Sequence, residues 1–305
     1  MIPAMNDLPE ILETGEAERL ATGFVFTEGP LWHPDGYYYI ADLRGANKLY
    51  RLTPGQAPVV VRETVGGNGT TFDLEGRLIQ CEGEGQRLTR TNHDGKVETL
   101  VERFKGGRLN RPNDVVCRSD GSIFFTDPDK RVPYAEREIP SPAGWDRVWD
   151  GSCVYRVAPD GGISLVANCE YPNGLAFSPD ERTLYVSNTR SSKYLHALEI
   201  DPAGNLVGRS IFADMNAGDL PGVPDGVKVD IEGRVFCTGS GGIWVFTPGG
   251  KHIGTIKFPE QAVNFAFGGA DLRTLFCCAH TSVYALRVKV PGLPHPWYRL
   301  RAQKH

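Results

Sequence analysis

The sequence predicts an all-β protein, specifically a six-bladed β-propeller with four antiparallel strands per blade. The first observation is a polar position that recurs in one register, at Glu28, Asn68, Asn113, Asn173, Asp225 and Asn264. The second is an acidic turn residue seven positions after each, at Asp35, Glu75, Asp120, Asp180, Glu232 and Asp271. Strand-like apolar runs flank each turn, and helical periodicity is nearly absent. Repeats of roughly 40 to 60 residues with strand–turn–strand content indicate propeller blades.

The first repeat illustrates the expected blade. Its inner strand starts near Glu28, and three further strands are predicted at 37–42, 48–52 and 58–62. Second strands of later repeats are predicted at 123–126, 184–187 and 235–237. We expect the segment 17–25 to add an outer strand to the sixth blade, because closure removes exposed sheet edges.

We expect residues 1–305 to form one domain. Residues 1–16 are predicted to be an N-terminal extension, 17–290 the blades, and 291–305 a tail on the outside or base of the ring. No Ser-rich or charged linker divides the repeats.

Strand direction places the recurring polar side chains on one face. The second strand of an up-and-down blade returns to the face where the inner strand starts, so the loops after second strands share that face. The longest of them, 128–151, carries Tyr134, Trp145 and Trp149. We interpret it as a lid or pocket wall, with a decorated surface loop as the alternative.

Composition excludes several classes of partner. The net charge is −4 and neither sign forms long runs, which argues against nucleic acid or a membrane surface as partner. No run approaches the ~18 apolar residues that span a bilayer, and no signal-peptide pattern is present. The 7 scattered cysteines favour a reducing compartment. We therefore expect a cytoplasmic monomer or homodimer.

The recurring positions offer oxygen ligands for a metal in the central channel. Glu28 and Asp225 carry carboxylates, while Asn113 and Asn173 carry amides. Histidines and cysteines do not cluster at zinc-type spacings. Hard cations prefer oxygen, so Ca²⁺ is the first choice, with Mg²⁺, Mn²⁺ or Zn²⁺ as alternatives. The competing interpretation is a hydrated channel without metal.

Four short motifs carry a family resemblance. They are Thr27-Glu28-Gly29-Pro30, Arg111-Pro112-Asn113-Asp114, Tyr171-Pro172-Asn173-Gly174-Leu175-Ala176-Phe177-Ser178 and Pro224-Asp225-Gly226. In this order they closely resemble the gluconolactonase, regucalcin and luciferin-regenerating-enzyme family, and bacterial gluconolactonases in particular. The resemblance covers nearly the whole chain, and it implies a six-bladed propeller with one divalent metal in its channel.

The resemblance also implies roles for individual residues. Glu28, Asn173 and Asp225 would be metal ligands, Asn113 would bind metal or substrate, and Arg111 would contact the substrate. A cation beside a lactone carbonyl stabilises the developing oxyanion. Asp225 is our candidate general base. The alternative is that Asp225 only ligates the metal and hydroxide attacks without its help.

Further pocket residues are predicted with open roles. Arg111 either reaches the substrate or pairs with Asp114 or a neighbouring acid. His280 either transfers protons or forms a wall. Asp127 and Asn188 end second strands, where they either help to form the pocket or serve as structural turn residues. The amides Asn68 and Asn264 are predicted to line the channel or hold water.

These expectations converge on an enzyme, a gluconolactonase-type hydrolase. It would convert a small sugar lactone, glucono-1,5-lactone, into gluconate with a divalent metal, calcium first. The enzymatic alternative is a phosphotriesterase-like or other lactone hydrolase that uses the same site. The non-enzymatic alternative is a calcium-binding propeller scaffold.

Overall fold

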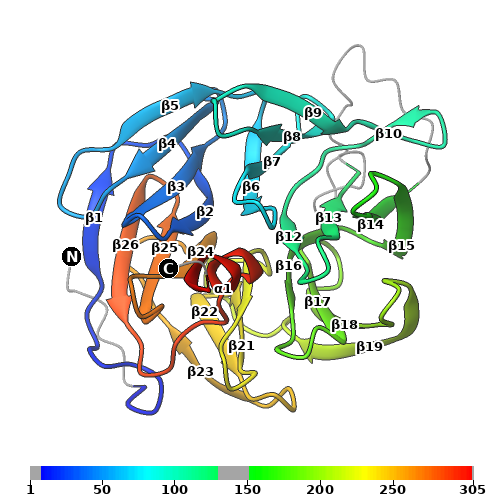
Figure 1. The fold of residues 1–305 in the computed structure, drawn as a ribbon. Helices are drawn as coiled ribbons and strands as arrows, with labels where there is room; N and C mark the ends of the chain where they lie inside the picture. The colour runs from blue at the N-terminus through cyan, green and yellow to red at the C-terminus, as the bar shows by residue number, and fades with distance from the viewer. Residues whose placement is uncertain (1–7, 130–150, 304–305) are drawn as a thin grey trace.

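The computed structural model describes residues 8–129 and 151–303. Six four-stranded antiparallel sheets surround a central axis, which confirms the predicted six-bladed β-propeller (Figure 1). The part of the insertion that carries Tyr134, Trp145 and Trp149 lies outside the described residues, and so does its interpretation as a lid. Within the described ranges, no helix is long and apolar enough to cross a membrane.

The strands run outward from the axis in each blade. The inner strands are β2 (Thr27–His33), β6 (Gly67–Phe72), β12 (Val115–Cys117), β16 (Pro172–Phe177), β20 (Val227–Val229) and β24 (Asn264–Gly268). The second strands are β3 (Tyr37–Asp42), β7 (Leu78–Glu82), β13 (Ile123–Asp127), β17 (Thr183–Asn188), β21 (Val235–Gly239) and β25 (Thr274–Ala279). The third strands are β4 (Lys48–Leu52), β8 (Arg87–Thr91), β14 (Ser152–Val157), β18 (Tyr194–Ile200), β22 (Gly242–Phe246) and β26 (Ser282–Arg287). The outer strands are β5 (Val59–Glu63), β9 (Val97–Val101), β15 (Ile163–Cys169), β19 (Leu206–Asp214), β23 (His252–Ile256) and β1 (Glu18–Thr22).

The N-terminal strand closes the ring. Strand β1 pairs antiparallel with β26, where Thr22 lies opposite Ser282, so the sixth blade takes its outer strand from the start of the chain. The main chain continues this contact, because Thr27 N–H donates to the carbonyl of His280 over 2.8 Å. The expectation for 17–25 is confirmed.

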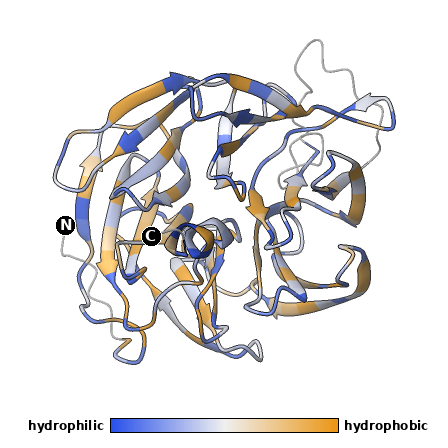
Figure 2. Ribbon diagram, viewed as in Figure 1, coloured by the Kyte–Doolittle hydropathy of each residue, from blue (hydrophilic) through white to orange (hydrophobic). Residues whose placement is uncertain are grey.

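Apolar packing holds the blades to one another. In the described part of the chain, the buried hydrophobic side chains form six clusters, and each cluster joins two neighbouring blades. Hydrophobic stretches accordingly recur on strands all around the ring (Figure 2). Each blade is a thin sheet that can bury both of its faces only against its neighbours, so the ring folds around its interfaces.

The acidic turn residues are explained by local hydrogen bonds. Asp120 Oδ1 accepts from the main-chain N–H of Ser122 over 2.8 Å, which fixes the hairpin between β12 and β13. In the second blade Asp73, two residues before Glu75, holds the turn instead. It accepts from Arg77 N–H over 2.9 Å and forms an ion pair with the Arg77 side chain.

The C-terminal tail ends in a short helix that the sequence pattern did not reveal. Helix α1 (Pro296–Ala302) lies near the central axis (Figure 1). His295 caps it and contacts Thr71 Oγ1 of β6 over 3.1 Å, and Tyr298 donates a hydrogen bond to the carbonyl of Trp32. A seven-residue helix carries too little periodicity to be recognised from sequence.

Two short strands lie outside the six blades. Strands β10 (Arg103–Phe104) and β11 (Gly107–Arg108) form a separate hairpin between the second and third blades.

Glycine permits the close approach of inner strands around the channel. A Cβ on Gly174, which follows the polar residue of the fourth blade, would lie 2.1 Å from the carbonyl oxygen of Asp225. A Cβ on Gly29 would lie 2.3 Å from the carbonyl oxygen of Asn68, and its φ of +54° also favours glycine. At Gly29 and Gly174, neighbouring inner strands approach this closely because the residue after the polar position has no side chain.

We expect Gly174→Ala to lower the free energy of unfolding by about 1–3 kcal/mol, because the new methyl group forces two inner strands apart. Chemical denaturation measures this loss. Gly249→Ala is the matched control, since its nearest atom is 3.9 Å away. Equal midpoints for the two variants would contradict the proposed packing constraint.

Candidate active site

Five of the six recurring polar side chains meet in one cavity. The cavity has a volume of about 890 Å³ and is lined by Glu28, Asn68, Asn113, Asn173 and Asp225. Asn264, from the sixth blade, instead lines a second cavity on the side of helix α1. The shared position in the repeat therefore places the polar side chains of five blades in one cavity, as the sequence pattern predicts.

Glu28 is buried and held by one of its two carboxylate oxygens. Oε2 accepts from the main-chain N–H of Gly29 over 2.7 Å and from Asn264 Nδ2 over 2.9 Å. The orientation of the Asn264 amide is fixed, because its Oδ1 accepts from Phe265 N–H over 2.8 Å. Oε1 is therefore the Glu28 oxygen that can serve a ligand in the cavity.

Asn173 presents its amide oxygen in the same way. Its Nδ2 donates to Thr189 Oγ1 over 2.9 Å, and that hydroxyl donates its own proton to the carbonyl of Pro224 over 2.7 Å. Since the hydroxyl can then only accept, the nitrogen of the amide must face Thr189. Asn173 Oδ1 is left buried, without a hydrogen-bond partner in the described part of the chain.

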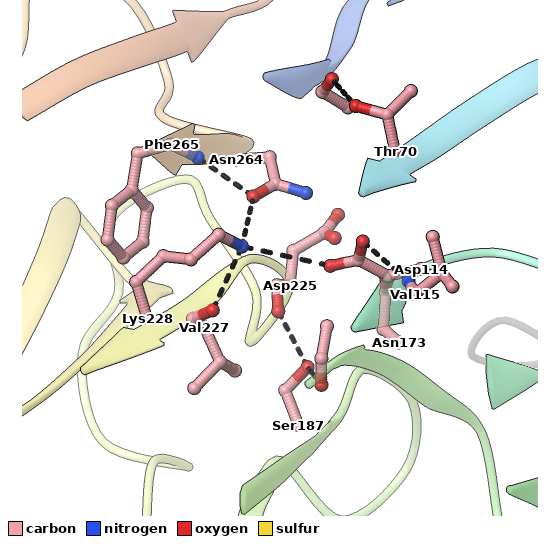
Figure 3. A network of polar contacts seen from close by, with 12 residues as sticks. Thr70, Asp114, Val115, Asn173, Ser187, Asp225, Val227, Lys228, Asn264 and Phe265 are labelled. Carbon is pink, nitrogen blue, oxygen red and sulfur yellow. Dashed lines mark hydrogen bonds and ion pairs between the residues drawn. The ribbon is translucent and has the colours of Figure 1, made fainter. Parts of the chain in front are cut away.

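Asp225 is fixed through its main chain. Its N–H donates to Thr238 Oγ1 over 3.0 Å, and its carbonyl accepts from Ser187 Oγ over 2.7 Å, as Figure 3 shows for the second bond. Among residues 8–129 and 151–303, Asp225 Oδ1 and Asn68 Oδ1 are also buried without a partner. Buried oxygens of this kind are costly unless a ligand or water satisfies them.

Several buried carboxylates lie close together in the site and raise one another's pKa. Burial, with the neighbouring carboxylate of Asp114, raises the pKa of Glu28 to about 7. Burial also raises the pKa of Asp225 well above its ordinary value, and Glu28 and Asp114 add to the effect. A divalent cation would favour the charged form of these carboxylates.

The set of donors fits a hard cation. The described ranges contain no metal-holding group of three or more histidine, cysteine, aspartate or glutamate side chains. The cavity instead combines the two carboxylates with amide oxygens, and oxygen-only sets of this kind suit calcium-like ions.

Lys228 lies on the base side of these carboxylates. Its Nζ donates to the carbonyl of Val227 over 2.9 Å and lies 3.5 Å from Asn264 Oδ1 and 4.0 Å from Asp114 Oδ2 (Figure 3). The ammonium group thus touches oxygens from three blades. Sequence reasoning missed this contact. The available signal was Asp114, which stands where four of the six repeats carry glycine.

Arg111 lines the cavity and is positioned by Asp127. Asp127 Oδ2 accepts from Asn110 N–H over 2.9 Å and from Asn110 Nδ2 over 3.2 Å, which holds the loop that carries Arg111. Asp127 itself is not among the residues that line the cavity. The ion pair of Arg111 is a long contact of 3.9 Å with Glu84 Oε1.

Asn188 plays the same part in the fourth blade. Its Oδ1 accepts from Tyr171 N–H over 2.7 Å, and its Nδ2 donates to the carbonyls of Arg190 and Ser192 over 2.9 and 2.6 Å. Like Asp127, it lies behind the cavity and organises a loop at its rim.

His280 does line the cavity. Its ring lies 5.2 Å from that of Phe26. Burial and the nearby Arg44 lower the pKa of His280, so the ring is neutral at pH 7.

Fold and site together define a six-bladed propeller with a polar cavity around its channel, where two carboxylates and three amides converge. Residues 26–281 match the SMP-30/Gluconolactonase/LRE-like family model, and the chain belongs to this family.

Its relatives include proteins from bacteria and a vertebrate. A gluconolactonase from Zymomonas mobilis is 29% identical over 297 residues, covering 90% of this chain and 82% of the relative. A regucalcin from Xenopus laevis is 32% identical over 279 residues, and the alignment covers 82% of this chain and 81% of the relative. The solved structure of a gluconolactonase from Xanthomonas campestris superposes with a TM-score of 0.82 at 32% identity, covering 94% of each chain. The resemblance identified from the four motifs is thereby confirmed.

We expect Asp127→Asn to change how stability depends on pH. Burial raises the pKa of Asp127 from an ordinary value of 3.8 to about 7. Between these values the folded protein holds a proton that the unfolded chain releases, so wild-type stability falls as pH rises through this window. The variant lacks this proton, so it should gain stability relative to wild type between pH 4 and pH 8. Urea denaturation across this range measures the difference, and parallel pH profiles would refute it.

Proposed function

We propose that this protein hydrolyses a sugar lactone with the help of a divalent cation, and that glucono-1,5-lactone is the first substrate to test. The observation that carries the proposal is the convergence of Glu28, Asn173 and Asp225 in one buried cavity, on the motifs that define the family resemblance. The gluconolactonases from Zymomonas mobilis and Xanthomonas campestris, which align with most of this chain, support the substrate class.

Glu28 Oε1, Asn173 Oδ1 and a carboxylate oxygen of Asp225 would hold the cation, with Asn113 at the mouth of the site. Calcium suits these oxygen donors best, and Mg²⁺, Mn²⁺ or Zn²⁺ are the alternatives to test. When bound, the cation would polarise the lactone carbonyl and stabilise the negative charge that develops on its oxygen.

The protein's own residues supply binding and proton transfer. Asp225 is our candidate general base, because its carboxylate lies in the cavity with Oδ1 unpartnered among the described residues. Arg111 offers a planar set of donors to ring or carbonyl oxygens of the substrate. His280 is neutral and forms part of the wall beside Phe26.

The dependence on metal is tested by stripping the protein with a chelator and adding back one cation at a time. We expect lactonase activity, followed by acid release, to disappear on stripping and to return most fully with Ca²⁺. The same cation should raise the melting temperature of the stripped protein, because it satisfies buried oxygens in the folded state only. Full activity after complete removal of metal would rule out this mechanism.

The role of Asp225 is tested by comparing two variants at saturating metal. A positioned general base contributes roughly 10²–10⁴-fold to the rate, so Asp225→Asn should lower kcat by that factor at any metal concentration. Glu28→Gln removes only a ligand, so high metal concentration should restore much of its activity.

Asp219→Asn is the control, because Asp219 lines the same cavity outside the proposed metal site. If Asp225→Asn binds metal and keeps most of its activity, Asp225 is not the base.

A further inference from the structure

Lys228 departs from the repeat that builds the channel. It stands three residues after the recurring polar position of the fifth blade, and the other five blades carry uncharged residues there, namely Leu31, Thr71, Val116, Ala176 and Phe267. Asp114 is a second departure, one residue after the recurring position of the third blade, where four blades have glycine. The two charged exceptions face each other, because Lys228 Nζ lies 4.0 Å from Asp114 Oδ2 (Figure 3).

Both side chains lie at the base of the channel. They line the cavity on the side of helix α1, which has a volume of about 150 Å³. Asp114 is buried, and its Oδ2 has no hydrogen-bond partner in the part of the chain that the structure describes. A buried carboxylate is costly unless a positive charge lies nearby. Lys228 supplies that charge to Asp114.

The amide of Asn264 connects this ammonium group to the proposed metal site. Its Oδ1 lies 3.5 Å from Lys228 Nζ, and its Nδ2 donates to Glu28 Oε2 over 2.9 Å. Gly226 permits the arrangement, since a Cβ there would lie 2.3 Å from Asn264 Oδ1. One amide group therefore separates the charge of Lys228 from a carboxylate that is assigned to the cation.

The charge of Lys228 acts on all three buried carboxylates. Burial raises the pKa of Glu28, Asp225 and Asp114, and the ammonium group offsets part of this rise in each case. A positive charge that attracts these carboxylates also repels any cation that binds among them. Lys228 and the divalent cation are therefore alternative partners for the same negative charge.

We propose that Lys228 is a positioning residue that acts as a built-in counter-ion at the base of the carboxylate cluster, where it stabilises the empty site and limits the affinity of the site for its divalent cation. This inference rests on the proposed metal-dependent function and concerns how tightly the cation is held. The ammonium group is a compact point charge, so its effect on a bound ion must grow with the charge of that ion.

The test compares Ca²⁺ with Tb³⁺, an oxygen-seeking ion close to Ca²⁺ in size. Both are titrated into stripped full-length protein at pH 7, Ca²⁺ by calorimetry and Tb³⁺ by its luminescence. Lys228→Met removes the charge and keeps most of the side-chain length. We expect its Kd for Ca²⁺ to fall about tenfold, and its Kd for Tb³⁺ to fall at least about threefold further, because the repulsion scales with ionic charge.

Thermal unfolding provides a readout that is independent of the titrations. Stripped Lys228→Met should melt at a lower temperature than stripped wild type, because its buried carboxylates have lost their counter-ion. Saturating Ca²⁺ should raise the melting temperature of the variant by more than it raises that of wild type, as tighter binding to the folded state requires.

Two further variants serve as controls. Lys228→Arg keeps the charge, so both values of Kd should stay within about threefold of wild type. Lys251→Met removes an exposed lysine from the same blade outside both cavities, so it should leave both values unchanged. If Lys228→Met does not fold, Lys228→Gln takes its place, because its amide can still donate a hydrogen bond at the position.

The remaining outcomes separate the inference from the function on which it rests. Unchanged or weaker binding by Lys228→Met would overturn the inference, and so would an equal gain for the two ions, because a charge effect must distinguish them. In these cases wild type still binds Ca²⁺ and the proposed metal site stands. If wild type binds neither ion, the metal site itself fails.

Discussion

The burial of carboxylates from separate blades at one point of the channel is the constraint on which the site depends. Glu28 and Asp225 come from the first and fifth blades, with Asp114 of the third blade nearby, and burial raises the pKa of each. Lys228 and Asn264 compensate these carboxylates from the base. Among the described residues, Asn173 Oδ1 and Asp225 Oδ1 lack a hydrogen-bond partner, and this is the side on which the proposed cation would bind.

A second design principle separates the groups that hold the loops from those that face the cavity. Polar residues at the ends of second strands bind main-chain groups just before the inner strand of the same blade. Asp42 accepts from Val25 and Phe26 N–H over 2.9 and 2.8 Å, and Asp127 and Asn188 make corresponding bonds in their blades. Rim loops can therefore carry different cavity residues while their anchors stay within the sheets.

Much of this arrangement could be predicted from the sequence because the blade is a repeat. Strand β4 was predicted at its observed bounds, and the closing strand and the cluster of recurring polar residues also followed from the period. Asn264 shows where the period fails. Strands β2, β6 and β16 have a register shift beside the recurring residue, whereas β24 pairs with β25 without a shift from Asn264 to Gly268. Asn264 stands inside this regular ladder, and its side chain lies on the base side, where it bonds Glu28. Contacts between blades, such as that of Lys228 with Asp114, depend on three-dimensional packing and leave no periodic signal.

The bond between Glu28 and Asn264 also makes the order of synthesis matter. Its two residues are separated by 236 positions, so the amide that orients the first blade's carboxylate is made almost last. The outer strand of the sixth blade is likewise separated from its partner in the sequence. Strand β1 is synthesised near the start of the chain and pairs with β26, which is synthesised near the end. A nascent or clipped chain that ends before residue 264 lacks the amide that bonds Glu28 Oε2, and its blades lack neighbours against which to bury a face. The contact that the sixth blade makes with Glu28 therefore forms only once nearly the whole ring has been synthesised.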